Sequence, residues 1–337
     1  MAREKQGVAC GYAARRPKRR RMDDPLSPLD THPDAPRIRS KKLADGVATL
    51  IVDGSGMRND ERKAMEGRLR DALPGVEVRI AMTAARKGAA PLIAIGSGKG
   101  GVGKSTVAAN LAVALQRMGK RVGMIDADIY GPSQPTLLSA HDRPQVEKQH
   151  LIPVEGASGV RLLSVGQLVP AGQALAWRGP MASGALAQLI DGVWGDTEIL
   201  LVDLPPGTGD VQLSLVQKAR PDGAVIVSTP QDLALIDATR AIDLFGKTGI
   251  PVLGLIENMA GYNCPHCGKV SDPFGSGGAE ASAAALGIAF LGRLPLSASL
   301  REASDAGTPP AANDGPAGDA FAELARRLIE QLETIAR

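Results

Sequence analysis

The sequence predicts an α/β fold in which a mostly parallel β-sheet is covered by helices on both faces, preceded by a small, truncated α+β segment. From residue 91 onward, short apolar runs alternate with longer helical patterns, which is typical of parallel sheets. Hydrophobic residues make up 44% of the 337 residues but aromatic residues only 3%, and such a core suits buried parallel strands. A glycine-rich segment lies between an apolar run and a helical pattern, where ligand-binding loops of these sheets occur.

Composition divides the chain into four parts. We expect a disordered basic tail over residues 1–42, a truncated α+β segment over 43–84, a linker over 85–90 and the α/β domain over 91–337. The tail holds 12 Lys and Arg against 5 Asp and Glu, so its net charge is +7, whereas the rest of the chain carries −4. The run from Arg15 to Arg21 could contact nucleic acid or an acidic partner, or direct targeting. The prolines of the tail favour a solvated, disordered arm instead.

The short segment before the linker contains two strands and one helix by pattern. Strands are predicted at Val47–Val52 and Val76–Met82, and a helix at Asp60–Leu73, which ends at the Pro74-Gly75 turn. Two strands and a helix bury too little apolar surface to be stable alone. We therefore expect an incomplete domain here.

The α/β domain is predicted to contain six main strands. They are expected at residues 92–95, 121–125, 160–165, 199–202, 223–228 and 252–256. Helices are expected at residues 107–115, 181–191, 209–219 and 231–247, with an amphipathic helix at the C-terminus. The polar face of this last helix mixes acidic and basic residues, so we expect it to pack on the core and not on a lipid surface.

The glycine-rich segment is a phosphate-binding loop. It reads Gly-Lys-Gly-Gly-Val-Gly-Lys-Ser-Thr between a predicted strand and a predicted helix, which is the context that this motif requires. Its backbone N–H groups and the helix N-terminus bind a polyphosphate, Lys104 reaches the β- and γ-phosphates, and the Ser105 hydroxyl binds Mg²⁺. The expected ATP-binding residues are Gly98, Lys99, Gly100, Gly101, Val102, Gly103, Lys104, Ser105 and Thr106. The α/β domain is thus predicted to be a P-loop NTPase.

Lys99 is a second lysine inside this loop. In this respect the loop resembles the deviant phosphate loops of MinD/ParA-like and nitrogenase-iron-protein-like ATPases. The resemblance implies two protomers that close face to face, with Lys99 of one contacting the phosphates bound by the other. It therefore implies a homodimer, and catalytic roles for Lys99 and Lys104.

Three aspartates follow predicted strands. Asp203 ends an apolar strand and has the position of a Walker B residue, while Asp126 and Asp128 follow another strand. Mg²⁺ is usually held by one or two carboxylates together with phosphate oxygens. By resemblance to the deviant-loop ATPases, Asp126 lies near the metal and Asp128 positions or activates the attacking water. The alternative for each aspartate is turn formation or helix capping.

Cys264 and Cys267 form a Cys-Pro-His-Cys motif. Two thiolates at this spacing are half of a tetrahedral sulfur site, and a second protomer would supply the other half for one [4Fe–4S] cluster on the two-fold axis. A dithiol redox pair, a zinc ion at the dimer axis and inert cysteines remain as alternatives. His266 is interpreted as a spacer, and Cys10 has no assigned role.

Composition also excludes several classes of protein. No apolar run approaches the roughly 20 residues that span a bilayer, the N-terminus lacks the apolar core of a secretion signal, and three cysteines do not make a disulfide scaffold. We expect a cytoplasmic protein without a membrane partner.

Several segments together resemble the Mrp/ApbC family of ATP-binding iron–sulfur cluster carrier proteins. They are Ser97–Thr106, Asp126–Pro132, Trp177–Met181, Val202–Asp210, Ser228–Asp232 and Glu257–Met259, the last leading into the cysteine pair. The resemblance covers about residues 90–310. It implies a labile [4Fe–4S] cluster received from an assembly scaffold and delivered to apo-proteins, slow Mg²⁺-dependent ATP hydrolysis, and an adenine contact for Asn258. The alternative for Asn258 is an asparagine that caps a loop. It also implies that residues 43–84 are the remnant of a small α+β domain found in many members.

Two other classes of function remain open at this point, a MinD/ParA-like positioning ATPase and a nitrogenase-like ATP-dependent reductase. A ParA-like ATPase binds DNA through basic patches, but the charge of −4 on residues 43–337 does not favour nucleic acid. A MinD-like positioning ATPase ends in a basic membrane helix, and a nitrogenase-like reductase keeps its cluster through turnover. Cluster lability distinguishes a carrier from a reductase.

Overall fold

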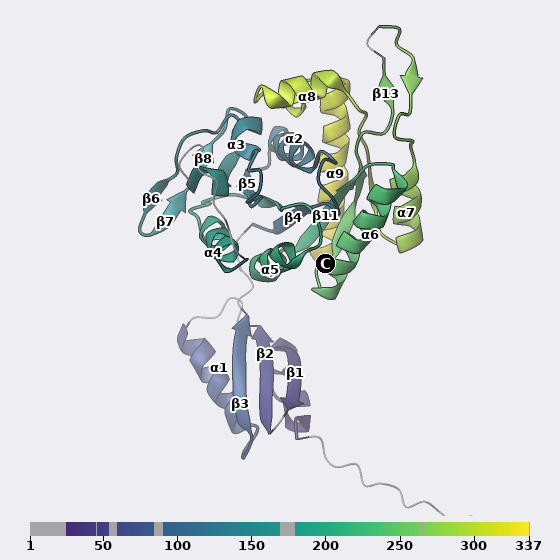
Figure 1. Ribbon diagram of the computed structural model, residues 1–337. Helices are drawn as coiled ribbons and strands as arrows, with labels where there is room; N and C mark the ends of the chain where they lie inside the picture. Colours follow the sequence, from purple (N-terminus) through teal and green to yellow (C-terminus); the bar gives the residue numbers. More distant parts are fainter. Residues whose placement is uncertain are drawn as a thin grey trace, which may run out of the picture. The chain divides into compact units, whose positions relative to one another are not determined.

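The computed structural model describes residues 25–44, 46–53, 59–83, 90–168, 179–264 and 266–336. The chain forms two compact units, Met1–Gly88 and Ala89–Arg337, which are described separately below. Figure 1 labels their helices and strands.

The first unit is a three-stranded sheet packed against one helix. Strand β1 (Ile38–Ala44) pairs antiparallel with β2 (Val47–Asp53), and β2 pairs in parallel with β3 (Glu77–Thr83). Helix α1 (Asn59–Asp71) buries Met65 and Leu69 in the same cluster as Leu50 of β2. The predicted helix and both predicted strands of this segment are therefore confirmed.

Residues 25–42 correct the prediction of a disordered tail over residues 1–42. Two 3-10 turns, Ser27–Asp30 and Ala35–Arg37, lead into β1, and Leu26 and Leu29 are only 5% and 1% exposed. The prolines occupy the first turns of these short helices, where proline is tolerated. The prediction relied on the charge and proline content of this segment and overlooked Leu26 and Leu29, which pack in the core of the first unit. Residues 1–24 and most of the expected linker at 85–90 lie outside the described residues.

The second unit is built on an eight-stranded sheet, and the predicted fold class is confirmed. The strand order is β15 (Phe290–Arg293), β12 (Val252–Glu257), β11 (Gly223–Ser228), β4 (Leu92–Gly96), β10 (Ile199–Asp203), β5 (Val122–Asp126), β9 (Arg161–Ser164) and β8 (Val154–Glu155). All neighbours are parallel except β8 with β9. Every residue of β4, β5, β10 and β11 is buried, as expected for strands covered on both faces.

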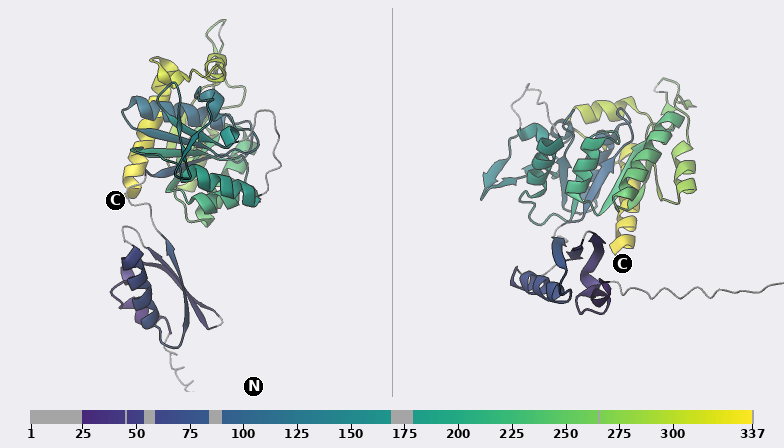
Figure 2. Two further views of the ribbon diagram at one scale, coloured as in Figure 1. Left: turned by 90° about the vertical axis from the view of Figure 1, so that its left-hand side faces the viewer. Right: turned by 60° about the horizontal axis from the view of Figure 1, so that its bottom comes forward.

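Helices cover both faces of this sheet (Figure 2). The core on one face includes side chains of α2 (Lys104–Arg117) and α9 (Pro316–Ala336). The core on the other face includes α4 (Gly179–Ile190), α5 (Asp210–Ala219), α6 (Asp232–Lys247) and α7 (Gly278–Leu286). Phe321, Leu324 and Leu328 of α9 are buried, so the prediction that the C-terminal helix packs on the core is confirmed.

Short elements escaped prediction. They are α3 (Gln134–Leu137), α8 (Ala298–Asp305), strand β15 with helix α7, and the hairpins of β6 (Gln145–Glu147) with β7 (His150–Ile152) and β13 (Tyr262–Asn263) with β14 (Val270–Ser271). Strands and helices of two to four residues carry little periodicity, and α7 and α8 are short helices of nine and eight residues. Within the described ranges, no helix has the length and hydropathy to cross a bilayer.

Candidate functional site

The phosphate loop runs from the end of β4 to the first residue of α2. Gly101 (φ 80°) and Gly103 (φ 79°) are left-handed, which favours glycine, and Gly103 caps α2. A side chain at Gly98 would place its Cβ 2.1 Å from the carbonyl oxygen of Asp237, so α6 passes directly against the loop. A cavity of about 210 Å³ lies along Ser97, Lys99–Thr106, Asp128 and Pro206. The loop is therefore folded as an anion cradle beside a helix N-terminus.

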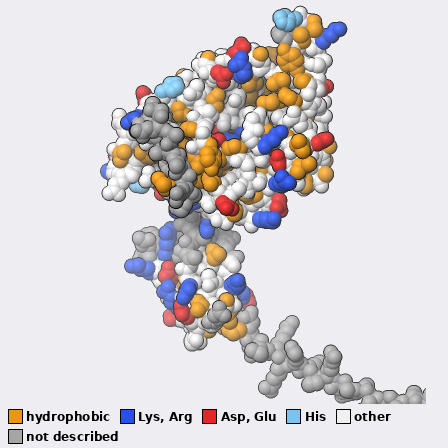
Figure 3. All heavy atoms as spheres, in the orientation of Figure 1, with side chains coloured by type: hydrophobic (Ala, Val, Ile, Leu, Met, Phe, Trp, Pro, Cys, Tyr) orange, Lys and Arg blue, Asp and Glu red, His pale blue; other side chains and the backbone are white. Residues whose placement is uncertain are grey.

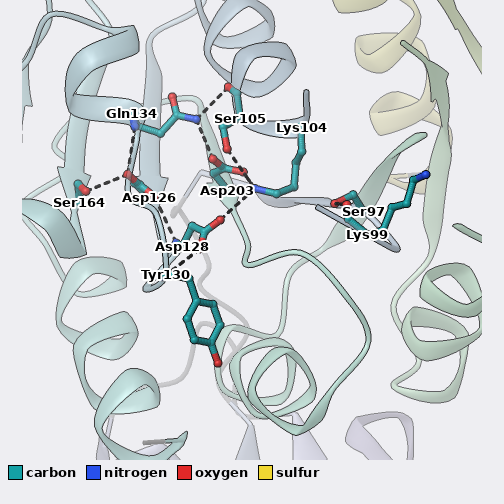
Figure 4. Close-up of polar contacts among 10 residues, drawn as sticks. All are labelled: Ser97, Lys99, Lys104, Ser105, Asp126, Asp128, Tyr130, Gln134, Ser164 and Asp203. Atoms are coloured by element: carbon teal, nitrogen blue, oxygen red, sulfur yellow. Dashed lines mark hydrogen bonds and ion pairs between the residues drawn. The ribbon is translucent and has the colours of Figure 1, made fainter. Parts of the chain in front are cut away.

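Lys104 lies among the aspartates that end β5 and β10 (Figure 4). It is 5% exposed, and its Nζ forms an ion pair with Asp203 and lies 3.9 Å from Oδ2 of Asp128. The Ser105 hydroxyl is 3.2 Å from the same nitrogen. The structure thus brings four predicted site residues together at the carboxyl ends of the strands.

Gln134 of α3 joins this cluster, and sequence reasoning missed it. Its Nε2 donates to Oδ2 of Asp203 at 2.8 Å and to the carbonyl of Ser105 at 3.0 Å, while its backbone N–H donates to Oδ2 of Asp126 at 3.1 Å. Its Oε1 is buried and has no hydrogen-bond partner among the described residues. A buried acceptor at this position fits a polar ligand or an ordered water of the site.

Burial makes the carboxylates unusual acids. It raises the pKa of Asp126 to about 7, with the charge of Asp203 as the second cause, although Ser164, Gln134 and Asp128 donate hydrogen bonds to Asp126. The pKa of Asp128 is also raised by burial, against the opposing charge of Lys104. A cation bound at this site would favour the ionised form of these carboxylates.

The chemistry of this donor set fits Mg²⁺ with a nucleotide. Mg²⁺ is bound by a few carboxylate and hydroxyl oxygens together with phosphate oxygens and water. In the part of the chain that the structure describes, no three His, Cys, Asp or Glu side chains are grouped to hold a metal ion by themselves. A metal ion here would therefore depend on phosphate oxygens as well as on the protein.

Lys99 points away from this cluster (Figure 4). Its Nζ lies 3.4 Å from Oε1 of Gln231, the residue that caps α6. Nearby on α6, the side chains of Leu233 and Ile236 are 73% and 51% exposed. The structure therefore places the Lys99 amine near an exposed apolar helix face and away from the Lys104 cluster, although the residue also lines the phosphate cavity.

Asn258 directly follows β12, and its side chain bonds to the phosphate loop. Its Nδ2 donates to the carbonyl of Val102 at 2.8 Å. A pocket of about 360 Å³ adjoins it, and its lining residues are Gly103, Thr106, Asn258, Met259, Tyr262, Pro295, Leu296, Ser297, Ala298, Leu300 and Arg301. Gly103 and Thr106 also line the phosphate cavity, so the two cavities meet. The wall at residues 295–301 escaped prediction because nothing in its sequence marks it.

Cys264 and Cys267 lie at the tip of the β13–β14 hairpin, which projects from the domain (Figure 1). The space-filling view shows hydrophobic side chains gathered along this hairpin (Figure 3), and Val270 is 69% exposed. Hydrogen bonds from the backbone of Cys267 and His266 lower the pKa of the Cys264 thiol. Cys267 is exposed, which does not suit an inert core cysteine. One chain presents an accessible pair of thiols here.

Comparison with known proteins places the chain in a family. The family model described as "NUBPL iron-transfer P-loop NTPase", of the ParA group, matches residues 89–329. The chain belongs to this family. The resemblance to iron–sulfur cluster carriers is thereby confirmed, and the domain is a P-loop NTPase.

Individual relatives agree with this assignment. An iron-sulfur cluster carrier protein of Methanocaldococcus jannaschii is 46% identical over 245 residues, which are 72% of this chain and 84% of the relative. The Arabidopsis thaliana iron-sulfur protein required for NADH dehydrogenase is 47% identical over 253 residues, 74% of this chain and 80% of the relative. The nucleotide-binding protein of Archaeoglobus fulgidus, solved with ADP, matches with a TM-score of 0.59 and 40% identity over 66% of this chain and 88% of that one.

Proposed function

We propose that this protein is an ATP-hydrolysing carrier that binds a labile [4Fe–4S] cluster between two protomers and transfers it to apo-proteins. The observation that carries the proposal is that one domain combines a phosphate-loop cavity with a cysteine pair, half-buried Cys264 and exposed Cys267, on a hairpin that follows shortly after a residue lining the adjoining pocket. The cysteine pair on this hairpin favours a cluster carrier over a positioning ATPase, because positioning does not require thiol ligands. The cluster is the cargo of the reaction, received from an assembly scaffold.

In the proposed nucleotide site, the loop N–H groups and Lys104 hold the phosphates of ATP. Ser105, Asp126 and Asp203 would hold Mg²⁺, which when bound neutralises phosphate charge. Asp128 orients the attacking water and accepts its proton, and its raised pKa suits that role. Asn258 and the adjoining apolar pocket receive the adenine.

Two features support a homodimer. Lys99 lines the phosphate cavity, but its amine lies by Gln231 near the exposed Leu233 and Ile236, so we expect it to reach the phosphates of a second protomer that docks on this face. A cation supplied across the interface stabilises charge on the transferred phosphoryl group. Each chain also contributes two accessible thiols where a [4Fe–4S] cluster takes four.

Cluster transfer tests the carrier function. The protein is loaded anaerobically with iron and sulfide, freed of unbound iron, and mixed with an apo-enzyme whose activity depends on its [4Fe–4S] cluster. We expect the acceptor to gain activity while the carrier loses its visible absorbance, and a Cys264→Ala, Cys267→Ala carrier to transfer nothing. A loaded protein that keeps its cluster through ATP turnover contradicts the proposal and favours a reductase.

Hydrolysis is tested separately. Asp128→Asn removes the proton acceptor but keeps the shape of the side chain, so we expect ATP to bind with near-normal affinity and its hydrolysis to be lost. Unchanged turnover would exclude Asp128 as the water-activating residue.

A further inference from the structure

A five-residue stretch, 258–262, leads from the nucleotide site to the cysteine hairpin, and we call it the connector. Asn258 at its start bonds to the phosphate loop through the carbonyl of Val102. Tyr262 at its end is the first residue of β13 and pairs with Ser271 across the hairpin. Cys264 follows two residues later. No other secondary-structure element intervenes between the two sites along the chain.

The connector contains an unusual backbone conformation. Met259 has φ 60°, in the left-handed region that residues other than glycine, asparagine and aspartate seldom adopt. Its side chain has no group that could compensate by a local hydrogen bond. Such strain persists where the surroundings hold the residue in place, and it is found most often at ligand clamps and switch regions. The strained residue here lies next to Asn258, at the edge of the nucleotide site.

The backbone around Met259 is tied on both sides. The N–H of Ala260 donates to the carbonyl of Leu294 at 2.9 Å, and the N–H of Leu296 donates to the carbonyl of Gly261 at 2.7 Å. Tyr262 also forms a parallel bridge with Leu296. Backbone hydrogen bonds therefore join the connector to residues 294–296. We expect a displacement at one end of the connector to move the other end as well.

Two connector side chains face the proposed base pocket. Met259 and Tyr262 line it opposite residues 295–301. The terminal methyl of Met259 lies 3.6 Å from the position that a Cβ on Gly103 would take, so this side chain lies next to the phosphate loop. A planar base that enters the pocket must contact the connector.

We propose that the connector couples the nucleotide to the cysteine hairpin: a purine base pressing on Met259 and Tyr262 shifts the hairpin and changes the exposure of Cys264 and Cys267. The inference rests on the proposed function, because it supplies the link between its two sites. Coupling of this kind is reciprocal, so a ligand on the thiols changes nucleotide affinity by the same factor.

Thiol reactivity reports this coupling without any cluster. Cys10 is first changed to serine, and the rate at which a disulfide reagent modifies the remaining two thiols is measured with and without MgADP. MgADP is supplied at saturation for each variant, according to its measured affinity. We expect a rate change of at least about 5-fold, the lower range of allosteric couplings.

Four variants locate the route. Met259→Gly relieves the strain and removes a side chain that lines the pocket, and Tyr262→Ala removes the ring, so each is expected to reduce the change to less than about 2-fold, below the usual range for coupled sites. Tyr262→Phe keeps the ring and is expected to retain the response. Arg220→Gly is the matched control, because Arg220 is also left-handed (φ 45°) but ends α5.

Three results would overturn the coupling: wild-type rates that ignore MgADP, a full response in Met259→Gly or Tyr262→Ala, or a lost response in Arg220→Gly. If Met259→Gly does not fold, the Tyr262 pair decides. If Cys264 and Cys267 take up no iron, the carrier function is overturned. The coupling can still be tested in that case, because the thiol modification rates are measured without iron.

Discussion

Replacing Lys104 by methionine is expected to destabilise the nucleotide-free protein, in addition to abolishing ATP binding. Lys104 is 5% exposed and its partner Asp203 is fully buried, so the substitution leaves a buried carboxylate without its cation. Removing one partner of a buried ion pair costs about 3–5 kcal/mol. Gln134 still donates to Asp203, so the lower end is expected, about 3 kcal/mol. For a unit of this size that is a fall in Tm of about 6–12 °C.

Tryptophan fluorescence follows the relevant unit alone. Both tryptophans, Trp177 and Trp194, lie in the second unit, so their signal during heating or denaturant titration does not report on residues 1–88. The measurement is made at pH 8 without nucleotide or Mg²⁺. At pH 6 the deficit of Lys104→Met should shrink, because burial raises the pKa of Asp128 and the charge of Lys104, which opposes this rise, is gone.

An exposed ion pair provides the control. Lys247 and Asp243 are 2.7 Å apart but 75% and 59% exposed, and such pairs contribute little to stability. Lys247→Met should therefore leave Tm nearly unchanged. If Lys104→Met is as stable as the wild type at pH 8, the buried ion pair does not contribute as described and the electrostatics of the site must be reconsidered.

Three further predictions concern the loop, pH and assembly. Gly103→Ala would place a Cβ 2.3 Å from Nδ2 of Asn258, on a residue with φ 79°. The nucleotide affinity measured by calorimetry should therefore fall at least about tenfold, the equivalent of about 1.4 kcal/mol. Gly246 has open space around it, so Gly246→Ala should bind nucleotide normally. The folded Asp126 has a pKa raised to about 7 and holds a proton that the unfolded chain has released, so the free energy of unfolding of the nucleotide-free protein should fall as pH rises from 5 to 8; equal slopes for wild type and Asp126→Asn would contradict this. Leu233→Glu places a charge on the exposed α6 face, so ATP-dependent dimerisation by light scattering should be lost while the monomer remains folded; a dimer of undiminished affinity would exclude this face.

The sequence predicted what depends on local pattern. Parallel strands bring their carboxyl ends to one edge of the sheet. Buried strands lead to the phosphate loop, Asp126 and Asp203, so the sequence alone predicts that these residues lie close together. Asn258 was selected from the family resemblance, and it follows β12. Long apolar or amphipathic elements were found because their periodicity is strong.

What escaped prediction depends on tertiary packing. Gln134 enters the site because α3 packs against α2 and β9, and no local signal marks a glutamine eight residues after Asp126 as its partner. The pocket wall at residues 295–301 and the strain at Met259 likewise exist only in the folded chain. In the first unit, Leu26 and Leu29 were overlooked because the charge of their neighbours dominated the pattern.

The shared cluster is tested most directly by the mass and metal content of one species. After anaerobic reconstitution in the presence of MgATP, native mass spectrometry should show two chains with four iron and four sulfide, and the Cys264→Ala, Cys267→Ala protein should show none. Metal bound to single chains, or iron retained without these cysteines, would contradict the cluster site between protomers.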